Sequence, residues 1–291
     1  MSHPLDGPRA KVERAKEHLD TLKRETAPLR GRLHYGKDYS VFSEFDPTTR
    51  KFGLRLRVLR PAPLLRFGIL VGDVVHQCRS ALDNLIEQAT IAHSGAALPG
   101  TEFPVFSDPS AYGQLITKGG RKGQPVPGSG LYAVRGIFPG AQAGVERLQP
   151  YNRDASRGPG PLSVLHDFWN MDKHRVPPVV ATSTLASYPK VTLQGAPGGS
   201  RDWYLMMMFP FEDGVNLIEG VLLSDETPQQ IESSVKVQLS SDIEFGDGPL
   251  GTQTGRRYPV VGVLEEAIKF AEAVIQDFSP FFPAVEQVAP S

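Results

Sequence analysis

Cysteine is almost absent from this chain, and Cys78 is the single example among 291 residues. One thiol cannot form an internal disulfide, which excludes the class of secreted proteins held together by disulfide frameworks. Chains without disulfides are typical of reducing compartments. We therefore expect a cytoplasmic protein.

Long hydrophobic runs are also lacking. The uninterrupted apolar stretches are only a few residues long, whereas a helix that crosses a membrane needs about 20 apolar residues. The first residues, MSHPLDGPRAKVERAKEHLD, contain no apolar stretch of the kind found in secretory signals. We expect a soluble protein with no membrane partner.

Familiar cofactor and catalytic motifs are missing as well. The runs GGRKGQPVPGSG and GPLGTQTG lack the lysine and the strand–loop–helix setting of a nucleotide-binding loop. Neither HExxH nor G-x-S-x-G occurs. His166 and His174 have no carboxylate at the usual ligand spacing between them. The sequence thus predicts no cofactor and no metal.

Charges of both signs are present, but they are unevenly distributed. Residues 1–66 carry 15 Lys and Arg against 8 Asp and Glu, whereas residues 176–291 carry 6 against 15. A basic N-terminal region could meet nucleic acid or anionic lipid, because positive surface attracts phosphate. The alternative, which we favour, is that the two oppositely charged regions attract each other within the fold.

Hydrophobic periodicity divides the chain into helices and strands. Apolar residues at helical spacing predict helices, and alternation of apolar and polar residues predicts strands. The predicted helices cover residues 9–30, 64–93, a short stretch within 108–117, the residues before 148, 162–176 and 260–279. The predicted strands cover residues 39–46, 51–60 and much of 178–245.

This order of elements predicts an α+β fold, with helices in the middle of the chain and strands on both sides. We expect a helical core over residues 65–176, whose long central helices pack with an antiparallel sheet from residues 39–60 and 178–245. No repeat period appears in the sequence. We predict a single domain over residues 1–291, closed by the C-terminal helix at 260–279.

The long helix over residues 64–93 has one broad apolar face. Cys78 lies in the middle of that face, which favours a buried thiol over a nucleophile. Arg79 and Asp83 border the face and, four residues apart, can pair along the helix. His76 lies on the other side of the helix.

The helix over residues 162–176 carries the densest group of reactive side chains, NMDKHR at 170–175. At about 100° per residue, Asp172 falls within the apolar stripe, while His174 projects from the polar face. An unpaired buried carboxylate is costly, so Asp172 needs a cation. We expect Asp172 to be buried and bonded to Arg79, with His174 pointing away.

Together these side chains predict an interhelical network. Its members are Arg79, Asp83, Asp172 and Arg175, with His76 as a further supporting residue. In one interpretation, which we favour, the network locks two core helices together. In the other interpretation it forms the wall of an active site.

Three segments carry a resemblance to known proteins: HQCRSALDNLIEQ (76–88), LQPY (148–151) and LHDFWNMDKHR (165–175). They are similar to a group of bacterial, actinobacterial-type proteins with a helix of the R-S-A-L-D-H-L kind, a Q-P-Y turn and an N-x-D-K-H-R segment. Asn84 stands where these sequences often have histidine. The resemblance covers roughly residues 65–176 and brings no established activity.

The same region bears a more distant resemblance to HEPN domains, helical bundles that include toxin and defence ribonucleases. The signature of that family is an arginine, often followed by a polar residue, and a histidine a few positions later on a helix. Asn170 and His174 match the polar residue and the histidine. Trp169 occupies the place of the arginine, so the cation would come from Arg79 or Arg175.

The resemblance implies an RNA-binding protein or a metal-independent ribonuclease of a bacterial defence or toxin type. His174 would move a proton at the ribose 2′-hydroxyl or the leaving oxygen, Arg79 would stabilise charge on the phosphate, and Asn170 would assist. The expected partner is RNA, and a homodimer is the candidate assembly. The alternative is a non-catalytic binding or assembly protein whose charged helix is purely structural.

Overall fold

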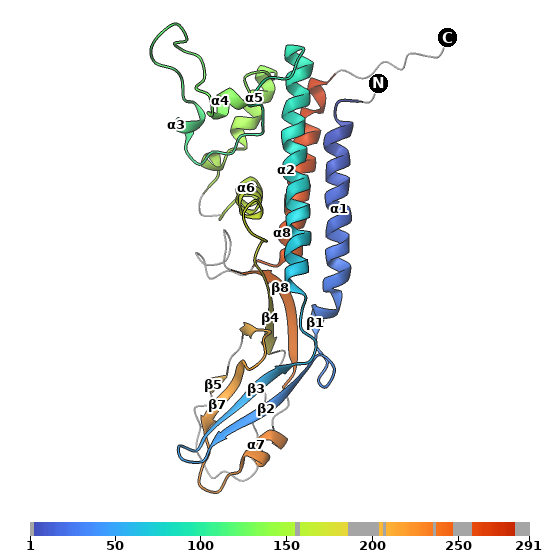
Figure 1. Cartoon of the computed structure of the whole chain (residues 1–291), viewed down its shortest axis with the longest axis vertical. Coiled ribbons are helices and arrows are strands. Elements are labelled where there is room, and N and C mark those ends of the chain that lie inside the picture. The colour runs from blue at the N-terminus through green and yellow to red at the C-terminus, as the bar shows by residue number, and fades with distance from the viewer. Residues whose placement is uncertain are drawn as a thin grey trace, which may run out of the picture. The chain divides into compact units, whose positions relative to one another are not determined.

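The chain has an α+β fold with a helical core and antiparallel sheets, as the sequence predicts (Figure 1). The computed structural model describes residues 3–154, 158–185, 204–205, 208–234, 237–246 and 258–282. The chain forms two compact units: unit 1 contains residues 1–23, 68–177 and 247–291, and unit 2 contains residues 24–67 and 178–246. The single domain stays a prediction, because compactness alone does not decide whether two interleaved units fold independently.

Unit 1 is helical. Its elements are most of α1 (Asp6–Thr26) and α2 (Leu64–Ser94), followed by α3 (Pro109–Tyr112), α4 (Gly130–Ala133), α5 (Pro139–Arg147), η2 (Pro150–Asn152), α6 (Pro161–Asp172), α8 (Val260–Phe278) and η4 (Ser279–Phe281). Helices α1, α2 and α8 run side by side (Figure 1). Among the described residues, no helix is long and apolar enough to cross a membrane.

The core of unit 1 lies between the apolar faces of these three helices. Fully buried side chains include Ala15 and Leu22 of α1, Val71, Val74, Cys78, Leu82 and Leu85 of α2, and Ala271 of α8. Burial raises the pKa of the Cys78 thiol to about 12. The thiol therefore stays protonated and acts as a small apolar side chain, as its place on the apolar face predicts.

Ion pairs join the basic N-terminal region to the acidic C-terminal region. The Nζ atom of Lys16 lies 2.6 Å from a carboxylate oxygen of Glu272. The Nζ atom of Lys23 lies 2.7 Å from Glu265. These pairs confirm that part of the charge asymmetry is neutralised within the fold. Each is partly exposed and contributes at most about 1 kcal/mol.

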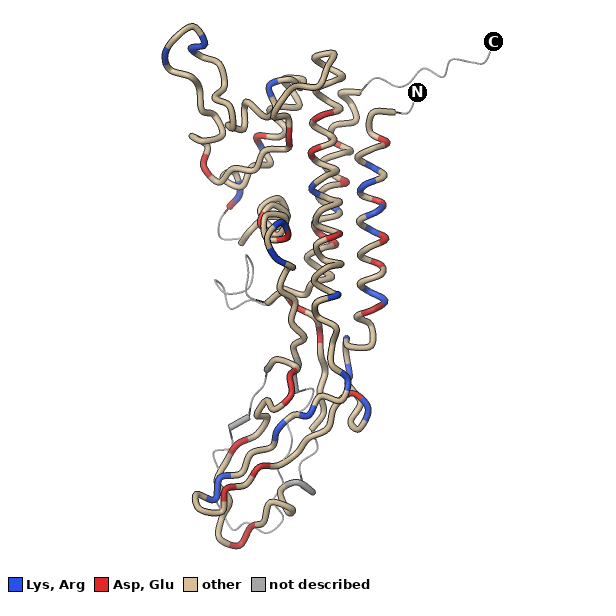
Figure 2. Tube along the Cα trace, viewed as in Figure 1, with Lys and Arg blue, Asp and Glu red and all other residues tan. Residues whose placement is uncertain are grey.

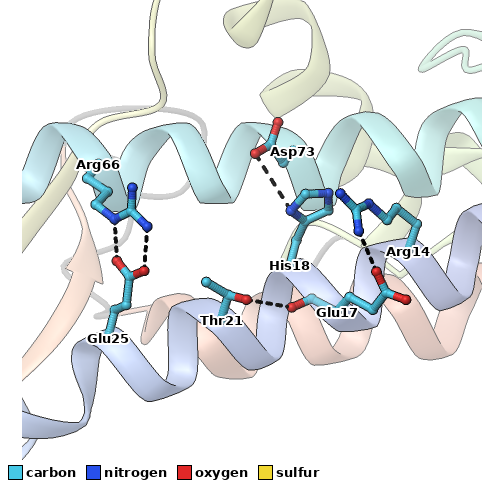
Figure 3. Close-up of polar contacts among 7 residues, drawn as sticks. All are labelled: Arg14, Glu17, His18, Thr21, Glu25, Arg66 and Asp73. Carbon is cyan, nitrogen blue, oxygen red and sulfur yellow. Dashed lines mark hydrogen bonds and ion pairs between the residues drawn. The ribbon is translucent and has the colours of Figure 1, made fainter.

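Helix α1 also contacts α2 through polar side chains. Lys11 donates a hydrogen bond to the hydroxyl of Ser80 at 2.8 Å. The Nδ1 atom of His18 lies 3.7 Å from a carboxylate oxygen of Asp73, as Figure 3 shows. These contacts fix the register of the two helices along unit 1.

Unit 2 consists of two antiparallel sheets in the described part of the chain. The first has the order β1 (Gly31–Arg32), β8 (Leu239–Phe245), β4 (Val179–Leu185) and β6 (Met208–Pro210); the second has the order β2 (Tyr39–Asp46), β3 (Lys51–Val58), β7 (Asn216–Val221) and β5 (Tyr204–Leu205). The predicted hairpin is confirmed, and its register runs from Tyr39 opposite Val58 to Asp46 opposite Lys51. Its alternation is also confirmed, because Phe52, Leu54 and Leu56 are buried.

Two further contacts hold the start of unit 2. Arg66 of α2 donates two hydrogen bonds to the carboxylate of Glu25, at 2.5 and 2.6 Å (Figure 3). The short helix η1 (Ala27–Leu29) follows α1, and the Ser241 hydroxyl donates to the Leu29 carbonyl. Helix α1 therefore ends at Thr26, and the predicted helix to residue 30 is wrong at its last turn.

One helix of unit 2 lies where the sequence predicts only strands. Helix α7 (Pro228–Ser234) follows Thr227, whose hydroxyl accepts from the Gln230 N–H at 3.4 Å. The Gln230 side chain accepts in return from the Thr227 N–H at 2.8 Å. This reciprocal pair is a capping box, and it starts the helix. The predicted strand KVTLQ, at 190–194, lies outside the described residues.

Two glycines of α2 allow the end of α6 to approach closely. A Cβ atom on Gly68 would lie 2.5 Å from Val176 Cγ1 and 2.7 Å from the carbonyl oxygen of Pro177. A Cβ atom on Gly72 would lie 2.9 Å from the carboxyl carbon of Asp172. Glycine at these two positions therefore lets the segment after α6 lie directly on α2.

The substitution Gly68→Ala tests this close approach. Because the Pro177 carbonyl is backbone and cannot turn aside, we expect a loss of about 1–3 kcal/mol in the free energy of unfolding. Gly262→Ala is the matched control, since Gly262 lies in α8 and has nothing within 4 Å of its Cβ position. It should gain roughly 0.5–1 kcal/mol from helix propensity. Urea denaturation measures both, and an equal gain in the two variants would contradict the close contact.

Candidate functional site

Arg79 and Asp83 lie one turn apart on α2 and form the predicted pair. The Nη2 atom of Arg79 lies 2.9 Å from a carboxylate oxygen of Asp83. The same atom donates to the carbonyl of Phe103 at 2.5 Å. Only 2% of Arg79 is exposed. The guanidinium therefore bonds the loop after α2 back onto the helix that carries it.

The loop receives further bonds from the Q-P-Y turn. The Asp83 carboxylate accepts from the Phe103 N–H at 2.9 Å. The buried side chain of Gln149 donates to the Pro104 carbonyl at 2.9 Å and accepts from the Phe106 N–H at 2.9 Å. We call residues 103–106 the clamped segment. The R-S-A-L-D helix and the Q-P-Y turn, distant in sequence, thus converge on this one segment.

Trp169 of α6 contacts two cations. The Nζ atom of Lys173 lies 3.1 Å from the centre of the Trp169 ring. The guanidinium carbon of Arg79 lies 5.1 Å from the same centre. Asn170 is bonded through its amide to the Nε2 atom of His166, at 2.9 Å. We call Arg79, Asp83, His166, Trp169, Asn170 and Lys173 the α2–α6 cluster.

Burial and neighbouring charge perturb two titratable groups of this cluster. Burial raises the pKa of the Asp83 carboxyl, and the charge of Arg79 and the Phe103 N–H oppose this rise. Burial, then the charges of Arg79 and Lys173, lower the pKa of His166. His166 is therefore neutral near pH 7. Within the described part of the chain, the Nε and Nη1 atoms of Arg79 and the Nδ1 atom of His166 are buried without a hydrogen-bond partner.

The predicted bond between Asp172 and Arg79 is wrong. Asp172 is half-buried and lies against Gly72, whereas Arg79 bonds Phe103 and Asp83. Burial and the charge of Asp73 raise the pKa of the Asp172 carboxyl, while His76 opposes the rise. Asp172 therefore forms no ion pair with Arg79. The position of Asp172 in the apolar stripe predicts where its side chain points, but it does not predict which residue the side chain contacts.

The predicted place of Arg175 in the interhelical network is also wrong, because α6 ends at Asp172 and Arg175 is exposed. The N–H groups of His174 and Arg175 both donate to the Met171 carbonyl in a turn, and Pro177 follows. A helical phase therefore does not apply beyond Asp172. His174 and Arg175 are both exposed. His174 does lie away from the core, as expected.

Two of the three residues assigned to catalysis, Arg79 and Asn170, lie in the α2–α6 cluster, and His174 lies outside it. Arg79 is buried, His174 is exposed, and the Asn170 amide is bonded to His166. His76 is exposed and acts on Asp172 only through its charge. Helical periodicity did not identify His166 as the hydrogen-bond partner of Asn170, although His166 lies one turn earlier on the same face of α6.

The chemistry of the cluster suits anions rather than metal ions. Its free groups are N–H donors and cations, and among the described residues no three His, Cys, Asp or Glu side chains form a group that could hold a metal. Asn84, at the position where related sequences often have histidine, lies instead against Gly7 of α1. Comparisons of the chain with protein-family models, curated proteins and solved structures found no match.

Replacing Arg79 tests whether its role is to hold the clamped segment. Arg79→Met replaces the apolar stem of the side chain but removes the bonds to Phe103 and Asp83. We expect a loss of about 3 kcal/mol in the free energy of unfolding, because the half-buried Asp83 carboxylate loses its cation. Arg175→Met is the matched control on an exposed arginine, with an expected change under about 0.5 kcal/mol. Equal losses in urea denaturation would show that Arg79 is not a structural anchor.

Proposed function

We propose that the chain is an HEPN-like RNA-binding protein, and that RNA contacts the end of α6. We call Trp169, Lys173, His174 and Arg175 the cationic end of α6. The observation that carries the proposal is the half-buried Trp169 ring under Lys173, followed by two further exposed side chains. In the described part of the chain, Lys173, His174 and Arg175 form no ion pair with a carboxylate.

These side chains can make the two kinds of contact by which proteins bind single-stranded RNA, one with its phosphates and one with its bases. Lys173 and Arg175 can neutralise phosphates, which supplies most of the affinity of non-specific binding. Lys173 covers the Trp169 ring at 3.1 Å, so a base can stack on this ring only when the Lys173 side chain turns away to a phosphate. The Arg79 guanidinium also contacts this ring, with its central carbon 5.1 Å from the ring centre.

Binding is better supported than cleavage. A metal-independent ribonuclease needs a base and a cation on one phosphate. The exposed His174 and the buried Arg79 do not share a surface, and Asn170 is bonded to His166. We therefore propose a cytoplasmic RNA-binding role of a bacterial defence or toxin type, in which cleavage by His174 is not part of the function. A homodimer stays a prediction.

A second candidate function is favoured by one observation. Arg79, Asp83 and Gln149 are all used in holding the clamped segment. These residues belong to the motifs of the resemblance, so those motifs fit a structural scaffold. In this alternative the chain is an assembly protein, and the cationic end of α6 is solvated.

The double variant Lys173→Gln with Arg175→Gln distinguishes the two candidates. We expect the wild-type chain to bind labelled single-stranded RNA in a salt-dependent manner. The variant should bind more weakly, and the slope of log K against log salt should fall by about 1.4, which is roughly 0.7 for each lost phosphate contact. Fluorescence anisotropy at several salt concentrations measures both quantities.

The control is a double variant with the same change in net charge, Arg14→Gln with Lys269→Gln. Both side chains are exposed and pair within their own helices, α1 and α8. The control should bind RNA like the wild-type chain. If the wild-type chain binds no RNA, or if both variants lose affinity equally, the site at the end of α6 is refuted.

A further inference from the structure

Residues 114–126, between α3 and α4, form a hairpin that we call the basic hairpin (Figure 1). Three backbone hydrogen bonds close it, from Ile116 N to Gln124 O, from Gly123 N to Ile116 O and from Val126 N to Gln114 O, at 2.9, 2.9 and 3.0 Å. Leu115 and Pro125 form a bridge across it. The segment is thus an ordered projection rather than a loose turn.

The base of the basic hairpin is fixed to the clamped segment. The buried ring of Tyr112, at the end of α3, lies 5.9 Å from the Phe106 ring, measured between ring centres. It lies 6.1 Å from the ring of Tyr151 in the Q-P-Y turn. Gly130, the first residue of α4, packs directly against the Tyr112 ring. The bonds of Arg79 and Gln149 therefore also position this projection.

The tip of the basic hairpin carries cations without counterions. Lys118, Arg121 and Lys122 are all exposed. Residues 109–145 contain no Asp or Glu, and Figure 2 shows only Lys and Arg at this tip. No described carboxylate pairs with the three side chains. Their charges are therefore unneutralised by the protein itself.

The backbone at the tip is equally open to an anion. The N–H groups of Gly119, Gly120 and Arg121 donate to no carbonyl in the described part of the chain. Gly119 has φ +83°, and neither glycine has an atom within 4 Å of its Cβ position. Consecutive unpaired N–H groups beside cations form a concave site for phosphate oxygens. Side chains at these positions would obstruct such an approach.

We propose that the basic hairpin binds the phosphate backbone of RNA, as a second contact region in addition to the cationic end of α6. The inference rests on the proposed function and extends it. The tip sequence TKGGRK contains no apolar or aromatic side chain. The one large exposed apolar side chain of the basic hairpin in the described part of the chain, Leu115, supplies little of the apolar surface that a bilayer or a protein pocket requires. Phosphates along a flexible strand need only the cations and the open N–H groups.

The triple variant Lys118→Gln, Arg121→Gln and Lys122→Gln tests the inference. Within the described residues these side chains form no hydrogen bond or ion pair, so the variant should keep the thermal stability of the wild-type chain. Its affinity for a labelled single-stranded RNA of about 20 nucleotides should fall roughly tenfold at about 0.1 M salt, and the salt slope should fall by about 2. The control is Arg9→Gln, Arg14→Gln and Lys269→Gln, which changes the net charge equally on α1 and α8 and should leave binding unchanged.

Parallel measurement of the variant at the end of α6 separates this inference from the proposed function. If the hairpin variant binds RNA like the wild-type chain while the α6 variant is weakened, the hairpin inference is overturned and the proposed function stands. If only the hairpin variant binds RNA more weakly than the wild-type chain, the hairpin inference stands and the proposed site at the end of α6 is refuted. If the wild-type chain binds vesicles of anionic lipid but no RNA, both are overturned.

Discussion

The bond from the buried Arg79 guanidinium to the Phe103 carbonyl is the contact on which the candidate site depends. A guanidinium that is only 2% exposed needs a carboxylate partner to offset its lost hydration. Asp83 supplies the carboxylate. That carboxylate also accepts from the N–H group of Phe103, the residue whose carbonyl accepts from Arg79. Together they hold the Phe103 backbone by both its donor and its acceptor.

The two proposed RNA contacts extend from this arrangement in different directions. On one side, the Arg79 guanidinium that holds the loop also contacts the Trp169 ring at the end of α6. On the other side, Phe106 and Tyr112 transmit the position of the clamped segment to the base of the basic hairpin. A structural role for Arg79 and a binding role for the surfaces around it are therefore compatible. Its buried position explains why Arg79 itself would not touch RNA.

The sequence predicted those features that depend on local periodicity. The β2–β3 hairpin and the long α2 follow from alternation and from helical spacing, and Cys78, Arg79 and Asp83 lie where the helical phase puts them. The end of α6 was mispredicted: the predicted helix runs to residue 176, whereas α6 ends at Asp172 and a turn follows. The contact partner of Asp172 depends on which neighbouring residue packs against it. Gly72 has no side chain, which lets the Asp172 carboxyl approach α2 at that position. Helix α7 had a readable signal in its capping box, Thr227 with Gln230.

Long-range contacts could not be deduced from one sequence. LQPY was recognisable as a motif, yet its spacing gives no reason for Gln149 to bond Pro104 and Phe106 rather than solvent. Likewise, the sequence GGRKG is typical of a solvated turn. The backbone hydrogen bonds of the basic hairpin and the buried Tyr112 show that this segment is an anchored projection. Periodicity gives the direction of a side chain, but tertiary packing gives its partner.

Amide hydrogen exchange tests the central claim most directly, because the clamped segment contains two loop amides with specific side-chain acceptors. The Phe103 N–H donates to Asp83 and the Phe106 N–H donates to Gln149. If the segment is clamped, both amides should exchange at least roughly 100-fold more slowly than the amides of Gly119 and Gly120, whose N–H groups are open. Exchange of the Phe103 and Phe106 amides as fast as that of the two glycines would contradict the account.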